Sequence, residues 1–275
     1  MATVGGPAQL EHAVGDHVCW VIDAEQTKRD AVVDFLRDGL GRGERLLYVA
    51  DQPLDDIVAL GDVTGLISDG RLRAEPLDAL FTTGDVDPVT QVGRLRDLTT
   101  EALDDGYTGL RVATDGTALV TDAEQRRAFM TYEVLADRYT AGAPVSALCT
   151  YDDRVLGEGA SELASVHRRR HATRPAGDPR FGVHLHGPRV VIAGEVDLAN
   201  HERFATALRA TAACDDGDLL LDLSELEFID SRGVGELRAF LAATSGRPFA
   251  IEDPRGFVRT IANALGWDDL LRALV

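Results

Sequence analysis

The sequence of 275 residues has few cysteines, a single lysine and no long hydrophobic run. Its three cysteines (Cys19, Cys149 and Cys214) are too few and too widely spaced for a disulfide framework, which indicates a reducing compartment. No apolar stretch approaches the roughly 20 residues that are needed to span a bilayer. The first residues lack the basic and then apolar pattern of a signal peptide. We therefore expect a cytoplasmic protein.

The sequence also lacks a phosphate-binding loop. The segment before the first expected helix, residues 21–32, contains no glycine and no G-x-x-x-x-G-K-[ST] pattern around Lys28. Asp115 follows an expected strand, where it would either resemble a magnesium-binding acid or act as an ordinary loop residue. We therefore expect no ATPase activity, no catalytic residue and no cofactor.

The chain carries a large excess of negative charge. Its formal net charge of -18 disfavours binding to nucleic acid or to an anionic membrane, because both would be repelled. A basic surface on another protein is a more suitable partner. Apolar residues make up 45% of the chain, which is enough for packed cores and argues against disorder.

The first part of the chain alternates strand and helix signals. Helices are expected at residues 25–40 and 88–104, and short buried strands at residues 45–51, 109–114 and 144–150. Thr121 and Glu124 have the spacing of a capping box before another helix. This alternation predicts a parallel sheet flanked by helices.

A weakly patterned stretch separates this block from a second one. Residues 154–171 are expected to form a surface helix with a basic end, either simply solvated or a docking site. A linker follows at residues 172–181, which contain two prolines and a glycine. The predicted domains are therefore residues 1–171 and 182–275. Strands of the second domain are expected at residues 182–186, 189–194, 218–223 and 248–252.

Ser231 is the most informative residue of the second domain. It stands between an apolar strand and a helix that carries Val234, Leu237 and Leu241 at helical spacing, so we expect it at the N-cap. A helix N-terminus also tolerates a phosphate, because its free N–H groups carry partial positive charge. Ser231 is thus either a simple cap or a phosphorylation site. Gly233 and Gly235 have no side chains, so a partner could approach the surface around Ser231 closely.

The second domain resembles a STAS domain of the anti-sigma-factor-antagonist family. The resemblance is carried by Gly194-Glu-Val-Asp197, by the stretch at residues 222–234 and by Gly266-Trp-Asp-Asp269. It implies that Ser231 is phosphorylated by a cognate anti-sigma factor that is a serine kinase, and that Asp197 and Asp230 lie beside it. These residues, with Arg232 and Gly233, are the expected partner-binding residues. Arg232 departs from the Ser or Thr of many members and would pair with a phosphate or alter kinase recognition.

His17, Cys19 and Cys149 are the candidate ligand-sensing residues of the first domain. They could meet in space and bind a soft metal or a small ligand, but they lack C-x-x-C spacing, and cysteines are often simply buried, so no metal is predicted. His17-Val-Cys19, the stretches at residues 35–51, 106–115 and 148–152, and Tyr132-Glu133 resemble a MEDS sensory domain. That resemblance implies a degenerate RecA-like fold that senses small organic ligands.

Together these observations predict an α/β protein with two parts. A RecA-like parallel-sheet sandwich without a phosphate loop precedes a smaller STAS α/β domain. The expected function is that of a non-enzymatic anti-sigma-factor antagonist. Phosphorylation at Ser231 would switch its partner binding, and the first domain would provide the sensory input. The alternatives are a constitutive STAS interaction scaffold without phosphorylation, and a nucleotide- or metal-dependent enzyme.

Overall fold

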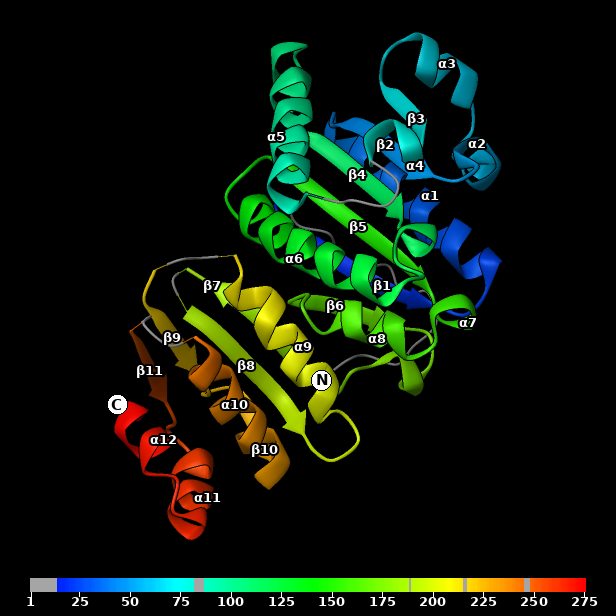
Figure 1. Ribbon diagram of the computed structural model, residues 1–275. Coiled ribbons are helices and arrows are strands. Elements are labelled where there is room, and N and C mark those ends of the chain that lie inside the picture. The colour runs from blue at the N-terminus through cyan, green and yellow to red at the C-terminus, as the bar shows by residue number, and fades with distance from the viewer. Residues whose placement is uncertain (1–13, 82–86, 188, 215–216, 245–247) are drawn as a thin grey trace.

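The computed structural model describes residues 14–81, 87–187, 189–214, 217–244 and 248–275, which form two α/β units with separate sheets (Figure 1). The first unit contains a six-stranded sheet in the order β3-β2-β4-β5-β1-β6, and every neighbouring pair is parallel. Its strands are β1 (His17–Ile22), β2 (Arg45–Ala50), β3 (Leu72–Pro76), β4 (Leu110–Asp115), β5 (Val145–Asp152) and β6 (Arg169–Ala172). The predicted parallel-sheet α/β fold is confirmed.

Helices cover both faces of this sheet. Alternate residues of β1 face opposite ways: Val18, Trp20 and Ile22 pack with α1 (Glu25–Arg42), whereas Cys19 and Val21 belong to the core on the other face. That second face is covered by α5 (Pro88–Asp104), α6 (Ala123–Thr140) and α8 (Glu158–Ala164). The shorter helices are α2 (Pro53–Asp56), η1 (Val58–Leu60), α3 (Val63–Ser68), α4 (Leu77–Leu80), η2 (Thr117–Leu119), α7 (Asp153–Leu156) and η3 (Pro175–Gly177).

The expected surface helix at residues 154–171 is wrong. Gly157 has φ +53° and separates α7 from α8, and α8 ends at Ala164. The arginine-rich segment that follows forms β6, which pairs with β1 at the edge of the sheet. His167, placed on that surface helix, is instead fully buried.

The second unit is built on a mixed sheet. Strands β10, β8, β9 and β11 are parallel neighbours, and β7 pairs antiparallel with β8. The strands are β7 (Phe181–His186), β8 (Arg189–Val196), β9 (Leu219–Asp222), β10 (Leu226–Ile229) and β11 (Phe249–Glu252). The helices are α9 (His201–Ala212), α10 (Ser231–Ala243), α11 (Phe257–Leu265) and α12 (Asp268–Ala273).

The two units pack directly on each other. Helix α6 of the first lies against α9 and β7 of the second (Figure 1), and a single apolar cluster includes Phe129 from α6 and Phe204 from α9. The segment predicted as a linker is bonded to both units. The Thr173 N–H donates to the Val21 carbonyl (2.9 Å), and the Asn200 side chain donates to the Pro179 carbonyl (3.3 Å).

Candidate functional site

Four polar side chains meet inside the first unit. His17 comes from β1, Glu133 from α6, Cys149 from β5 and His167 from the segment after α8. His17 Nε2 lies 3.1 Å from Glu133 Oε2 and 3.4 Å from Cys149 Sγ. Glu133 Oε2 also lies 3.6 Å from Cys149 Sγ and 3.5 Å from His167 Nε2. All four residues are buried, so this group, here called the buried cluster, lies away from bulk water.

Neighbouring groups orient the buried cluster. The Tyr151 hydroxyl donates to Glu133 Oε1. His167 Nδ1 lies 2.8 Å from the Leu163 carbonyl, which can only accept, so Nδ1 carries the proton and Nε2 faces the cluster. His17 Nδ1 lies 3.7 Å from Asp137 on the next turn of α6. Both rings and the carboxylate are thus held in place from outside the cluster.

The electrostatics of the buried cluster centre on Glu133. Burial alone would raise the pKa of this carboxyl, but His167 and His17 outweigh burial and lower the pKa below its ordinary value. The Cys149 thiol shows the opposite balance, because burial and then the charge of Glu133 both raise its pKa. Within this structure the cluster therefore holds a carboxylate and a protonated thiol.

Sequence reasoning found half of the buried cluster. His17 and Cys149, 132 positions apart, do meet. Cys19 pairs in register with Cys149 and is buried on the same face, but it stands outside the group of four. Glu133 was quoted only as part of a family motif, and His167 was hidden in the expected surface helix. The register of β1 with β5 and the packing of α6, which bring these residues together, are not visible in local sequence.

Ser231 lies at the exposed start of α10, but it is not the N-cap that the sequence predicts. Asp230 is the cap, and its carboxylate accepts bonds from the N–H groups of Arg232 and Gly233, both at 2.9 Å. A carboxylate in this position satisfies two free donors of the first turn. The Ser231 hydroxyl therefore stands on the surface and is not required to cap the helix.

Asp197 lies on the same edge of the second sheet as Ser231. The Asp230 N–H donates to the Val196 carbonyl (3.1 Å), which joins the ends of β8 and β10. Asp197 comes directly after Val196 in the sequence, and Ser231 comes directly after Asp230. Arg180, which sequence reasoning missed, donates to Asp197 (3.2 Å) and pairs with Glu195. It stands 17 positions before Asp197, and no local pattern predicts the pairing.

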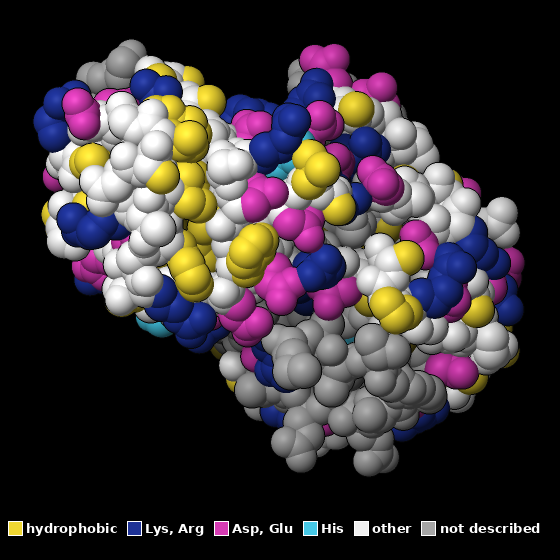
Figure 2. Space-filling model, turned by 90° about the horizontal axis from the view of Figure 1, so that it is seen from below, with side chains coloured by type: hydrophobic (Ala, Val, Ile, Leu, Met, Phe, Trp, Pro, Cys, Tyr) yellow, Lys and Arg dark blue, Asp and Glu magenta, His cyan; other side chains and the backbone are white. Residues whose placement is uncertain are grey.

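The other expected partner-binding residues differ in exposure. Arg232 is exposed, whereas Gly233 is buried on the side of α10 that faces the sheet. Figure 2 shows a band of apolar side chains over the C-terminal unit, bordered by acidic ones. The exposed large apolar residues of this unit are Leu198, Phe228, Leu265 and Val275. Leu198 follows the end of β8 by two residues and Phe228 is the second-last residue of β10, so the edge with Ser231 has apolar surface to offer a partner.

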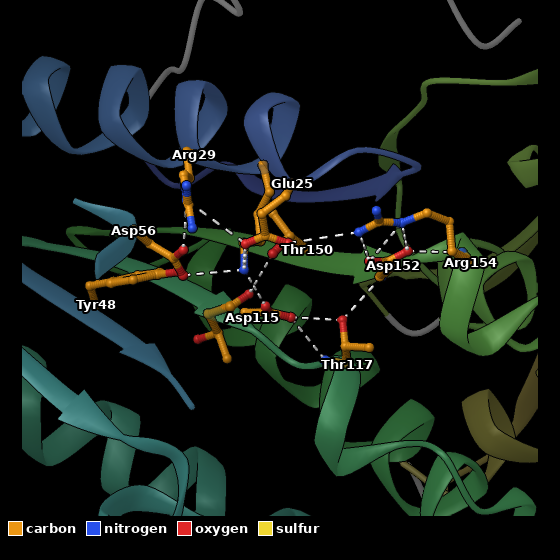
Figure 3. A network of polar contacts seen from close by, with 11 residues as sticks. Glu25, Arg29, Tyr48, Asp56, Asp115, Thr117, Thr150, Asp152 and Arg154 are labelled. Carbon is orange, nitrogen blue, oxygen red and sulfur yellow. Dashed lines mark hydrogen bonds and ion pairs between the residues drawn. The ribbon is translucent and has the colours of Figure 1, made fainter. Parts of the chain in front are cut away.

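A second polar network occupies the carboxyl edge of the first sheet. Lys28 Nζ lies 2.7 Å from Glu25, 2.9 Å from Asp115 and 3.2 Å from Asp56. Figure 3 shows these carboxylates converging between α1 and the sheet. The Tyr48 hydroxyl donates to Asp56 (2.6 Å). Burial would lower the pKa of Lys28, but the three carboxylates outweigh burial and raise it above its ordinary value.

Asp115, for which the sequence left two interpretations open, belongs to this network. The residue ends β4, and it also accepts bonds from the backbone and hydroxyl of Thr117. The single lysine is surrounded by internal carboxylates in the region where a phosphate loop would bind nucleotide. A phosphate placed here would meet like charges.

Comparisons with known families agree with this architecture. The family model described as MEDS, "MEthanogen/methylotroph, DcmR Sensory domain", matches residues 16–168, and that described as "Mlab, STAS domain" matches residues 180–273. The chain belongs to the MEDS family and continues into a STAS domain. No curated protein matches the sequence. The pairing of these domains supports a signalling role of the anti-sigma-factor-antagonist type with a sensory input.

The part of the chain that the structure describes contains no helix both long and apolar enough to cross a membrane.

Proposed function

We propose that the STAS domain binds an anti-sigma factor that is also a serine kinase, and that phosphorylation of Ser231 releases it. The observation that carries this proposal is the exposed Ser231 at the start of α10, where Asp230 already supplies the cap. If the Ser231 hydroxyl were the N-cap, its phosphorylation would also remove the cap and destabilise the start of α10. Here the hydroxyl is available while α10 keeps its own N-cap.

The charges around Ser231 suit a reversible switch. A phosphate adds roughly -1.5 to -2 charge next to the Asp230 carboxylate and near Asp197. The helix N-terminus and the Arg232 side chain offset part of this charge, so the modified domain stays folded. A partner docked against the same edge loses complementarity and dissociates.

The first domain acts in this proposal as the sensory input. A cavity of about 620 Å³ is lined by His17, Asp137 and Arg168 of the MEDS domain and by Leu185 and His186 of the STAS domain. A small organic ligand bound here would contact both domains. It would bias partner binding only if its affinity differs between the free and the bound STAS arrangement.

The same proposal treats the chain as a kinase substrate and not as an enzyme. Its support is the internal neutralisation of Lys28 and the lack of a phosphate loop. The three cysteines form no disulfide, which agrees with action in the cytoplasm. Transcription would be regulated indirectly, through the sigma factor that the partner releases.

The test compares variants that add one negative charge at different places. Ser231→Asp should abolish binding of the full chain to the anti-sigma factor, and Ser231→Ala should keep binding but accept no phosphate. Ser224→Asp is the matched control, because Ser224 is also exposed and lies in the same domain. Binding is measured by calorimetry, and phosphate on Ser231 by mass spectrometry of protein from its native host.

The two outcomes separate the proposal from its rival. Loss of binding in Ser231→Asp alone, with partial phosphate occupancy in the cell, supports the switch. Equal binding by Ser231→Asp and the unmodified protein would instead establish the constitutive scaffold.

A further inference from the structure

We propose that the buried cluster of His17, Glu133, Cys149 and His167 is a binding site for one divalent transition-metal ion of the zinc type. The proposal is independent of Ser231, because it concerns only the MEDS domain. It differs from the expectation from sequence, which contained only three scattered candidates and predicted no metal.

The spacing of the donor atoms fits a tetrahedral ion. Zinc binds nitrogen and oxygen at about 2.0–2.2 Å and sulfur at about 2.3 Å, so tetrahedral ligands stand roughly 3.3–3.6 Å apart. The separations from Glu133 Oε2 are 3.1 Å to His17, 3.5 Å to His167 and 3.6 Å to Cys149. His17 and Cys149 are 3.4 Å apart. One ligand atom from each of the four residues lies within 4.8 Å of all the others.

One nitrogen of the buried cluster is available to bind a metal ion. The Nδ1–H group of His167 donates to the Leu163 carbonyl, and His167 Nε2 has no hydrogen-bond partner among the described residues. Glu133 Oε2 lies 3.5 Å from this nitrogen, so one ion could bind both atoms. A metal ion would bind these two atoms together with His17 and Cys149, whose thiol proton is released to solvent on binding. An added proton on His167 is the competing explanation.

The identity of the donors selects the class of metal. Two imidazoles, one thiolate and one carboxylate suit zinc and related transition metals, whereas magnesium and calcium prefer sets of oxygen ligands. Outer contacts of the type that support metal ligands are present. Tyr151 bonds to Glu133, the Leu163 carbonyl holds His167, and Asp137 lies beside His17.

The site has an access route and a structural consequence. The cavity between the two domains reaches His17 and Asp137, on one side of the buried cluster. An ion bound in the buried cluster would connect β1, β5, α6 and the segment before β6. Because α6 also packs on α9 of the STAS domain, the ion would hold the helix that the domains share.

The experiment uses the purified full chain, stripped with a chelator under reducing conditions. We expect one Zn²⁺ per chain by elemental analysis after reloading. Co²⁺ should give the intense visible bands of a tetrahedral site and a near-ultraviolet thiolate charge-transfer band. His167→Gln should weaken Zn²⁺ binding by more than about 100-fold, because even changes outside the ligand set cost roughly 10–100-fold.

The cysteines provide matched controls. Cys149→Ser should lose the charge-transfer band, whereas Cys19→Ser, on the same face of the sheet, and Cys214→Ser, in the STAS domain, should keep it. Circular dichroism verifies that each variant is folded. If Cys149→Ser does not fold, the wild-type spectrum and metal content still decide the matter. Substoichiometric metal in folded wild type, a cobalt spectrum without a thiolate band, or equal loss in Cys19→Ser would overturn the proposal and favour a protonated His167.

Discussion

The carboxylate of Asp230 accepts two backbone N–H bonds at the start of α10 and so relieves Ser231 of capping. The same shift occurs at α6, where the sequence predicts Thr121 as the cap with Glu124 three positions later. There Asp122 accepts bonds from the N–H groups of Glu124 and Gln125. At both helices an aspartate stands next to a hydroxyl residue, and the aspartate is the cap.

The two neighbours at the start of α10 should respond differently to alanine. Asp230→Ala removes the cap and should lower the free energy of unfolding by about 0.5–2 kcal/mol. Ser231→Ala should leave it unchanged, because this exposed side chain caps nothing. Urea titrations of the two full-length variants measure the difference. A larger loss from Ser231→Ala would mean that the hydroxyl supports the helix after all.

The caps of α6 and α10 were predicted from sequence to within one position. The start of α10 was found, yet local spacing cannot decide which of two adjacent residues with side-chain oxygens adopts the extended cap conformation. The distant pairing of His17 with Cys149 was anticipated. His167 was not, because its burial depends on α8 ending at Ala164 and on β6 joining the sheet edge.

At the scale of elements, α10 approaches the sheet closely through Gly233. A Cβ atom at this position would lie 2.6 Å from Ile229 Cγ1 and 2.7 Å from Val196 Cγ1, both in strands beneath the helix. Real Cβ atoms do not come this close to packed side chains. Gly233 therefore sets the distance between α10 and the ends of β8 and β10, and so keeps Ser231 at the sheet edge that also carries Asp197.

Adding one methyl group to α10 should have opposite effects at two glycines. Gly233→Ala should destabilise the protein by about 1–3 kcal/mol, because the helix must move away from the sheet. Gly235→Ala meets only Trp267 at 3.8 Å and should stabilise by up to about 1 kcal/mol through helix propensity. Thermal and urea unfolding compare the two. A neutral Gly233→Ala would show that α10 is not held at this distance.

Elements with strong local patterns were predicted best. The amphipathic helices and the buried strands β2, β4 and β5 match their expected positions closely. The strands β1, β3, β6 and β10 were not predicted. β3 and β6 are edge strands, and their charged residues resemble loop or helix-end sequence. Such strands are specified by the neighbour that they pair with, and single-sequence reading does not contain that neighbour.

At the scale of the whole molecule, the two domains meet across a buried histidine. His184 lies in β7, and its Nδ1 has no hydrogen-bond partner among the described residues. Burial, and then the positive charges of Arg168, Arg170 and His186, lower its pKa from 6.5 to about 4. The folded protein therefore keeps this ring neutral where an unfolded chain would protonate it.

This depressed pKa predicts a loss of stability in mild acid. Between pH 6.5 and about 4 the unfolded chain binds the extra proton, so the free energy of unfolding falls as the pH falls. At about 1.4 kcal/mol per unit, the full contribution of His184 is about 3 kcal/mol. His184→Leu should flatten this part of the urea-stability profile, and His186→Leu, at an exposed neighbour, should change it far less, because the charge of His186 is the smallest of the causes. Parallel profiles for His184→Leu and wild type would contradict the prediction.

The apolar cluster that α6 shares with α9 also constrains how such a protein can evolve. If recombination replaced one domain, the residues that it contributes to the shared apolar core would be replaced by a surface that does not fit the remaining domain. Any incoming STAS domain would need an α9 and a β7 that fit α6, in addition to its own recognition edge. We therefore expect the two domains to change together, with substitutions on α6 accompanied by compensating substitutions on α9.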